Sequence, residues 1–335
     1  MAEHVTILGD GAMATVCSLL LTAGGHRVTM WGAFEASVER LRHDRTQHRL
    51  LPGVKVPEEV RLTSHDADCF DAATMIVSAI PTQHTRSVWQ RLRPHVPGGV
   101  PVVSVSKGIE NVTLLRPTQV IADALDTPHH WPLAALSGPN IAAELARRLP
   151  GTAVAACDDA AVAQRAQAAF STPWFRVYTN DDVVGVELAG ATKNVIAIAA
   201  GILDGLAAGN NAKSALVTRG LVEISRLGAA MGAKGETFAG LAGLGDLITT
   251  CVSPEGRNRS VGERIGRGQK LAQILADMPS VAEGVPTTQS VLELARRYDV
   301  EMPITEAVHA VLFEDLEVRQ AIGRLMAREP KPERG

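Results

Sequence analysis

The stretch Gly9-Asp10-Gly11-Ala12-Met13-Ala14 decides the fold that this sequence predicts. It separates a short apolar run at residues 5–8 from a helical pattern over residues 12–23. In the pattern G-x-G-x-x-G/A, the first glycine allows a tight turn and the second lets the backbone approach a pyrophosphate, while the last small residue lets helix and strand pack closely. Because strand, turn and helix occur in that order, the stretch indicates a dinucleotide-binding unit rather than a plain turn.

Alternating strand and helix signals continue beyond this turn. Short apolar runs separated by helical patterns are typical of a mostly parallel sheet covered by helices. The expected strands span residues 27–31, 75–80, 100–105, 133–136, 152–156 and 174–178. A further helix is expected from Asn140 to Arg148. The first half therefore predicts an α/β fold with a Rossmann-like doubly wound sheet.

Strand signals almost disappear after residue 180. Helical patterns cover residues 183–208, 212–231, 260–276, 287–298, 305–313 and 318–327. We therefore expect a dinucleotide-binding domain at residues 1–183, an all-helical substrate domain at residues 184–328 and a polar tail at residues 329–335.

Composition narrows the class of protein. A chain of 335 residues is longer than a domain with a single hydrophobic core, which suggests two domains. The net charge of -3 gives no positively charged surface for binding nucleic acid. The four cysteines form no C-x-x-C pair, which favours a reducing compartment over a disulfide framework or a zinc site. The longest apolar run, residues 195–203, is about half of a membrane helix. We expect a cytoplasmic protein without a signal peptide, an integral membrane segment or a metal; its oligomeric state stays open, with a homodimer as one candidate.

Polar residues gather where ligands bind in such sheets, beyond the carboxyl ends of the strands. Lys107 follows one expected strand, and Gly138-Pro139-Asn140 follows another. Lys193 lies inside an apolar helical pattern, where burial would lower its pKa and suit it for proton transfer. The alternative for Lys107 is an ordinary surface lysine. The alternative for Lys193 is a lysine at the edge of the core whose ammonium group reaches water.

The helical half contains two more candidate groups. Asp246 and Thr250 are four residues apart and share a face of a helix, although Asp246 could simply cap its N-terminus. Arg257 and Asn258 open another helix, which is a natural phosphate site, although a solvated basic turn has the same appearance.

The end of the second expected strand reads Trp31-Gly32-Ala33-Phe34-Glu35. An acid here would bind the ribose 2′-OH of NAD, and an arginine would bind the 2′-phosphate of NADP. Neither stands directly at the strand end, and Glu35 and Arg40 are more typical of solvated helix positions. Local chemistry therefore leaves the choice between NAD and NADP open.

Taken together, these segments resemble the bacterial-type NAD(P)-dependent glycerol-3-phosphate dehydrogenases over nearly the whole chain. The matching segments are GDGAMATV at Gly9, SKGIE at Ser106, SGPNIAAELA at Ser137, ELAGATKNVIAIAAG at Glu187, NAKSALVTRGLVEISRLGAAMGA at Asn211, FAGLAGLGDLITTC at Phe238, GRNRSVGERIGRG at Gly256, VAEGVPTT at Val281 and EMPITEAV at Glu301. The resemblance implies reversible reduction of dihydroxyacetone phosphate to sn-glycerol 3-phosphate for phospholipid synthesis.

The resemblance also implies roles for individual residues. Lys193 matches the general acid/base, Lys107 matches a lysine that contacts substrate and cofactor, and Asp246 and Thr250 match their catalytic partners. The implied substrate contacts are Lys107, Gly138, Asn140, Lys193, Asn194, Asp246, Arg257 and Asn258. The implied NAD or NADP contacts are Gly9, Gly11, Ala12, Met13, Ala14, Ala33, Phe34, Lys107, Ala142, Arg257, Val281 and Glu283.

This sequence departs from the family pattern at four positions. Ala12 and Met13 replace the usual serine and aromatic residue, and Asn140 replaces threonine or serine. Ala33 replaces an arginine that would bind a 2′-phosphate, so we expect NADH to be used at least comparably to NADPH. Two alternatives are a two-domain dehydrogenase of a β-hydroxy acid, in which the asparagine follows the lysine at a greater distance, and a non-catalytic dinucleotide-binding homologue.

Overall fold

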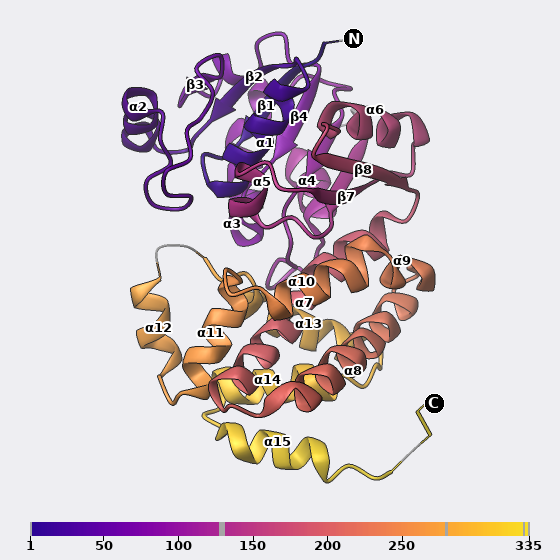
Figure 1. The fold of residues 1–335 in the computed structure, drawn as a ribbon. Coiled ribbons are helices and arrows are strands. Elements are labelled where there is room, and N and C mark those ends of the chain that lie inside the picture. Colours follow the sequence, from indigo (N-terminus) through magenta and orange to yellow (C-terminus); the bar gives the residue numbers. More distant parts are fainter. Residues whose placement is uncertain (1, 127–130, 279–280, 331, 334–335) are drawn as a thin grey trace.

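An eight-stranded sheet with helices on both faces forms the first half of the chain (Figure 1). The computed structural model describes residues 2–126, 131–278, 281–330 and 332–333. The strands run in the order β3-β2-β1-β4-β5-β6-β7-β8. Their bounds are β1 (His4–Leu8), β2 (Arg27–Trp31), β3 (Arg61–Thr63), β4 (Met75–Ser78), β5 (Val102–Ser104), β6 (Leu133–Ser137), β7 (Gly151–Ala156) and β8 (Phe175–Asn180).

The sheet is parallel except where β6 meets β7, which confirms the mostly parallel sheet that the sequence predicts. Strand side chains alternate between two cores. Val5 and Ile7 of β1 join one core with the helices at residues 12–23 and 160–170, whereas Leu8 joins the other with the helices at residues 82–92 and 117–125. Strand order reverses between β1 and β4, so a ligand is expected to bind at the carboxyl ends of those strands. The covering helices are α1 (Ala12–Ala23), α2 (Glu35–Asp44), α3 (Thr82–Leu92), α4 (Pro117–Leu125), α5 (Ala142–Ala146) and α6 (Ala160–Phe170).

Helices alone form the second half among its described residues, as the sequence predicts. The central one, α7 (Val183–Gly205), is buried along almost its whole length. The others are α8 (Gly209–Ala230), α9 (Gly235–Ala239), α10 (Asp246–Val252), α11 (Arg257–Gly266), α12 (Leu271–Asp277), α13 (Gly284–Arg297), α14 (Pro303–Phe313) and α15 (Val318–Met326), with a short π-helix at Leu241–Gly245. By length and composition α7 could cross a membrane, but 94% of its most apolar window is buried inside the molecule, as in the core helix of a globular protein.

Two glycines bring α11 directly against α7. A Cβ atom on Gly262 would lie 1.9 Å from the carbonyl oxygen of Ile198, and one on Gly201 would lie 2.0 Å from that of Arg259. Real atoms cannot approach so closely, so only glycine allows these two helices to touch along their backbones. This contact brings the start of α11 beside the middle of α7.

Two helix predictions are wrong, one at its ends and one in its middle. The helix expected from Asn140 to Arg148 is only α5, Ala142–Ala146, because Ile141 is extended and Arg148 adopts a positive φ of 59°. The helix expected over residues 260–276 is two helices, α11 and α12, because the turn between them contains Gly268 at a φ of 89°.

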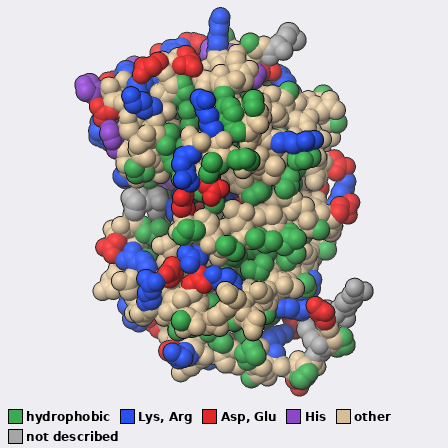
Figure 2. Space-filling view, in the orientation of Figure 1, with side chains coloured by type: hydrophobic (Ala, Val, Ile, Leu, Met, Phe, Trp, Pro, Cys, Tyr) green, Lys and Arg blue, Asp and Glu red, His purple; other side chains and the backbone are tan. Residues whose placement is uncertain are grey.

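Charged side chains of both signs are scattered over the face in Figure 2, without a single basic field. The last helix ends at Met326, before the predicted polar tail. Residues 331, 334 and 335 of that tail lie outside the described part of the chain.

Candidate active site

One buried carboxylate, that of Asp246, joins two lysine ammonium groups. Its Oδ2 accepts a hydrogen bond from Lys107 Nζ at 2.6 Å, and its Oδ1 accepts one from Lys193 Nζ at 2.7 Å. Asp246 is only 2% exposed and Lys193 only 6%. Two positive charges and one negative charge leave this enclosed cluster with a net positive charge, which favours an anionic ligand or an oxygen that gains negative charge.

Three separate elements supply the cluster. Lys107 follows β5, Lys193 lies in the middle of α7, and Asp246 is the first residue of α10. Thr250 lies one turn after Asp246, so its hydroxyl accepts a hydrogen bond from Lys193 Nζ and donates one to Asp246 Oδ1 at 3.3 Å. The lysine that the sequence places inside an apolar helix is therefore buried and paired.

The loop after β6 holds the other side of Lys107. Lys107 Nζ donates to the carbonyl oxygen of Gly138 at 3.0 Å and to Asn140 Oδ1 at 2.7 Å. Asn194 Nδ2 donates to the carbonyl oxygen of Lys107 at 3.3 Å. Burial, together with the nearby positive charge of Lys193, lowers the pKa of Lys107 to about 8, against the opposing effect of Asp246.

A second group comes from the start of α11 and the segment before α13. Arg257 Nη1 donates to the carbonyl oxygen of Val281 at 2.9 Å, and Asn258 Oδ1 accepts from the Gly284 N–H at 2.9 Å. Glu283 Oε1 accepts from the Thr82 N–H at 3.2 Å, so this segment reaches the start of α3. Enclosure raises the pKa of Glu283 to about 7, although the Thr82 N–H and the positive charge of Arg257 oppose the shift.

The first turn fits a dinucleotide. Gly9 has a φ of 120°, and a Cβ there would lie 2.8 Å from the Ala79 carbonyl oxygen, so only glycine permits this approach. The N-cap of α1, Gly11, provides no side-chain hydrogen bond, which leaves N–H groups of the first turn available for a phosphate. Among the described residues, Glu283 Oε2 and Thr82 Oγ1 are buried without a hydrogen-bond partner, and both lie against Gly108, where a Cβ atom would be 3.1 and 2.7 Å from them.

The remaining predicted cofactor residues surround this turn. Ala12, Met13 and Ala14 form the first turn of α1, and Ala142 begins α5, which packs beside α1. At the end of β2, Ala33 is partly buried and Phe34 is 75% exposed. The structure thus brings the predicted residues together in three groups: the lysine cluster, the α11 group and the first-turn group.

Comparisons with known proteins match this chain along both halves. The models for the N-terminus and the C-terminus of NAD-dependent glycerol-3-phosphate dehydrogenase match residues 4–163 and 182–323. The chain belongs to this family. A glycerol-3-phosphate dehydrogenase [NAD(P)+] from Geobacter sulfurreducens is 48% identical over 100% of both chains. One from Salinibacter ruber is 48% identical over 99% of this chain and 97% of its own.

A solved structure extends the match to three dimensions. The glycerol-3-phosphate dehydrogenase from Coxiella burnetii superposes with a TM-score of 0.93 at 34% identity, covering 98% of this chain and 99% of that one. In this member of the glycerol-3-phosphate dehydrogenase family, the cofactor is accordingly NAD or NADP.

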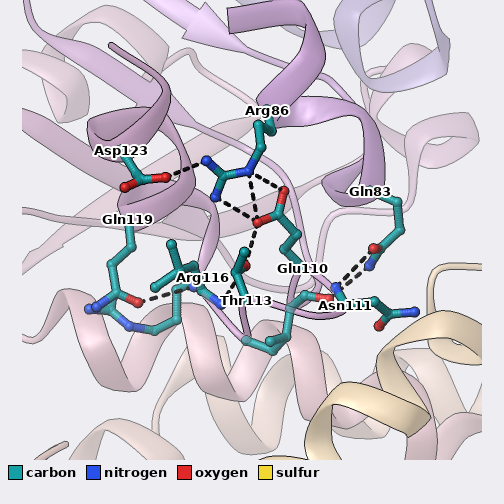
Figure 3. A network of polar contacts seen from close by, with 10 residues as sticks. Gln83, Arg86, Glu110, Asn111, Thr113, Arg116, Gln119 and Asp123 are labelled. Atoms are coloured by element: carbon teal, nitrogen blue, oxygen red, sulfur yellow. Dashed lines mark hydrogen bonds and ion pairs between the residues drawn. The ribbon is translucent and has the colours of Figure 1, made fainter. Parts of the chain in front are cut away.

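Sequence reasoning on this dehydrogenase missed the contacts that hold the loop after Lys107. Arg86 of α3 donates from Nη2 to Glu110 Oε2 at 2.8 Å and also pairs with Asp123 of α4 (Figure 3). Gln83 Nε2 donates to the carbonyl oxygen of Ile109 at 2.8 Å. The segment SKGIE contains Glu110, but the sequence alone does not show which residue pairs with this carboxylate. These contacts fix the loop that carries Lys107 to the sheet half.

The same loop is also fixed to the helical half. Arg116 pairs with Glu187 of α7, and Glu187 Oε1 accepts from the Thr118 N–H at 2.8 Å. Ser290 of α13 donates to the Ile109 carbonyl oxygen at 3.0 Å. Glu187 is 4% exposed, and burial raises its pKa despite the opposing effect of Arg116. The position of Lys107 therefore depends on both halves of the chain.

Proposed function

We propose that the lysine cluster performs the glycerol-3-phosphate dehydrogenase reaction, the reversible reduction of dihydroxyacetone phosphate to sn-glycerol 3-phosphate for phospholipid synthesis. The observation that carries the proposal is the buried Asp246 carboxylate bridging Lys107 and Lys193. Such a cluster holds a proton donor and a positive charge in fixed positions beside a reacting ketone. Reduced NAD or NADP, when bound, supplies the hydride for the ketone carbon.

Lys193 is the proposed general acid and base. Its ammonium at Nζ donates a proton to the oxygen of the ketone as that oxygen gains negative charge, and takes a proton from the alcohol in the reverse direction. Asp246 and Thr250 hold Nζ through two hydrogen bonds, so its direction is set before substrate binds. Burial of the pair away from water strengthens this electrostatic contribution.

Lys107 is proposed to stabilise the negative oxygen and to contact both substrate and cofactor. Gly138, Asn140 and Asn194 complete its surroundings on the substrate side. Arg257 and Asn258, at the N-terminus of α11, are the proposed phosphate site, because a guanidinium group and helix N–H groups both favour a dianion. Remote phosphate binding then fixes the ketone against Lys193.

The proposed cofactor contacts extend across the crevice. Gly9 and Gly11, with the first turn of α1, hold the pyrophosphate, while Ala33 and Phe34 lie toward the adenine ribose. Lys107, Ala142, Arg257, Val281 and Glu283 complete the proposed cofactor site.

Three finer assignments belong to the same proposal. We assign residues 1–183 to cofactor binding, residues 184–328 to substrate binding and residues 329–335 to a tail. All four cysteines are buried free thiols, which supports a reducing location, the cytoplasm. We propose a homodimer as the assembly, with molar mass from light scattering as its test.

The deciding experiment measures oxidation of reduced nicotinamide by dihydroxyacetone phosphate, with NADH and NADPH in parallel assays. The proposal expects stoichiometric formation of sn-glycerol 3-phosphate. Oxidation of a β-hydroxy acid such as 3-hydroxypropanoate, without a reaction on the phosphorylated ketone, would instead support the two-domain β-hydroxy acid dehydrogenase. Binding of the dinucleotide without either reaction would support a non-catalytic homologue.

A further inference from the structure

The side chain of Asp10 reaches the place where the second strand ends. Asp10 stands between the two glycines of the first turn, and the Gly9 N–H donates to the Trp31 carbonyl oxygen at 2.8 Å, so this turn lies against the end of β2. A Cβ atom built on Gly32 would be 3.1 Å from both Cγ and Oδ2 of Asp10. Val38 Cγ2, at 2.6 Å, is nearer still, so Val38 and the Asp10 carboxylate together leave no room for a side chain at residue 32.

One hydrogen bond fixes the carboxylate there. Ser37, in the first turn of α2, donates from Oγ to Asp10 Oδ2 at 2.6 Å. Gln47 Nε2 donates to the Asp10 carbonyl oxygen at 2.6 Å and so holds the backbone of the turn. The other carboxylate oxygen, Oδ1, accepts no hydrogen bond from the described part of the chain and is available to a ligand.

Two guanidinium groups near the end of β2, those of Arg91 and Arg42, are already engaged. Arg91 lies over the Trp31 ring, donates from Nη1 to the Ala33 carbonyl oxygen at 3.1 Å and pairs with Asp66. Arg42 donates to the Leu62 carbonyl oxygen at 2.9 Å and pairs with Glu39. The fixed negative charge of Asp10 is thus not neutralised by either arginine.

We propose that Asp10 determines the choice of dinucleotide: it accepts a hydrogen bond from the ribose 2′-OH and excludes the 2′-phosphate, so this chain prefers NADH to NADPH. A carboxylate at the end of the second strand performs this discrimination in dinucleotide-binding folds. Here the first turn supplies it, because β2 ends at Trp31 and the next two residues, Gly32 and Ala33, carry no carboxylate. The inference rests on the proposed function only in placing the adenine ribose at this turn.

Binding of two adenosine ligands to the full-length protein tests the inference without catalysis. Calorimetry with 5′-AMP and with adenosine 2′,5′-bisphosphate compares ligands that differ only in the 2′-phosphate. We expect the unmodified protein to bind 5′-AMP about tenfold or more tightly, since juxtaposed like charges are costly. Asp10→Asn, and Asp10→Ser as a second variant, should reduce that ratio to about threefold or less.

Glu35→Gln is the matched control, because it removes an equal charge from an exposed side chain in the first turn of α2. The binding ratio should stay within about twofold in this control. An equal effect of Glu35→Gln and Asp10→Asn would overturn the inference, since bulk charge would then account for both. Tighter binding of the bisphosphate by the unmodified protein would also overturn it, most directly if Arg40→Gln abolished that preference.

The ratio of kcat/KM for NADH to that for NADPH should change in the same direction in Asp10→Asn. If dihydroxyacetone phosphate is not reduced with either dinucleotide while the adenosine ligands still discriminate as expected, the proposed reaction fails and the role of Asp10 stands. If dihydroxyacetone phosphate is reduced normally but Asp10→Asn leaves the ratio of the two adenosine ligands unchanged, the proposed reaction stands and the role of Asp10 fails.

Discussion

At the residue scale, Lys193 and Lys107 share one carboxylate, but we propose different tasks for them. Lys193 makes its two hydrogen bonds within the helical half, to Asp246 and Thr250. Lys193→Ala should reduce turnover by about two orders of magnitude or more, the usual effect of removing a positioned acid. Thermal unfolding should show a folded protein, and near-normal turnover would remove Lys193 from the proton-transfer role.

The pKa of Lys107, about 8, gives the reaction a pH dependence with a definite sign. Below that pH the ammonium is charged and can play its proposed role of stabilising a negative oxygen; above it the charge is lost. Because kcat/KM reports groups of the free enzyme, its value for dihydroxyacetone phosphate should fall as pH rises through about 8. Initial rates across the alkaline range check this expectation.

Two variants show which group causes the fall in kcat/KM at alkaline pH. Lys107→Arg keeps its charge throughout the accessible range, so the fall near pH 8 should disappear, whatever activity remains. Glu283, with a pKa raised to about 7, is the nearby group that could contribute, and Glu283→Gln should leave the fall in place. A kcat/KM that rises through pH 8 would contradict the assigned role of Lys107.

Arg257 gives a prediction about substrate rather than chemistry. Its guanidinium stands at the N-terminus of α11, where a phosphate would gain a charge-assisted hydrogen bond. Arg257→Ala should weaken binding of dihydroxyacetone phosphate by about 2 kcal/mol or more. The slow reaction of unphosphorylated dihydroxyacetone should change little in the same variant. Equal losses with both ketones would mean that Arg257 does not bind the phosphate.

At the element scale, the sequence predicts the elements that have a strong local pattern. The turn at Gly9 and the apolar run around Lys193 indicate their structures because strand–turn–helix order and apolar periodicity are local properties. The position of Asp10 at the end of β2 is not local: it depends on the pairing of β1 with β2 and on the space above Gly32. The partner of Glu110 is likewise set by the packing of α3 against α4.

The contact between α7 and α11 positions the proposed phosphate site relative to Lys193. Gly262→Ala would place a methyl group 1.9 Å from the Ile198 carbonyl oxygen, so the two helices must separate. We expect a loss of about 2 kcal/mol or more in the free energy of unfolding. Gly323→Ala in α15 is the control, because a Cβ there meets open space, and alanine in a helix should be neutral or slightly stabilising. Equal stability of the two variants in denaturant would refute the close contact.

At the scale of the whole molecule, the proposed active site lies where the two halves meet. Lys107 and Asn140 come from the sheet half, whereas Lys193 and Asp246 come from the helical half. The buried pair of Arg116 and Glu187 joins those halves one loop away from Lys107. Stability and catalysis should therefore both respond to this pair.

Arg116→Ala leaves the Glu187 carboxylate buried without its cation, so we expect a loss of about 3–5 kcal/mol in unfolding free energy. Replacing both partners, as in Arg116→Met with Glu187→Leu, should recover much of that loss, since no uncompensated charge remains. Burial already raises the pKa of Glu187, and removing Arg116 raises it further. The folded variant then binds more protons than its unfolded chain, so its deficit should shrink as pH falls toward the acid range. Denaturant unfolding of the parent and both variants at acid and neutral pH measures this, and a deficit that does not depend on pH would show that Glu187 is not the group left unpaired.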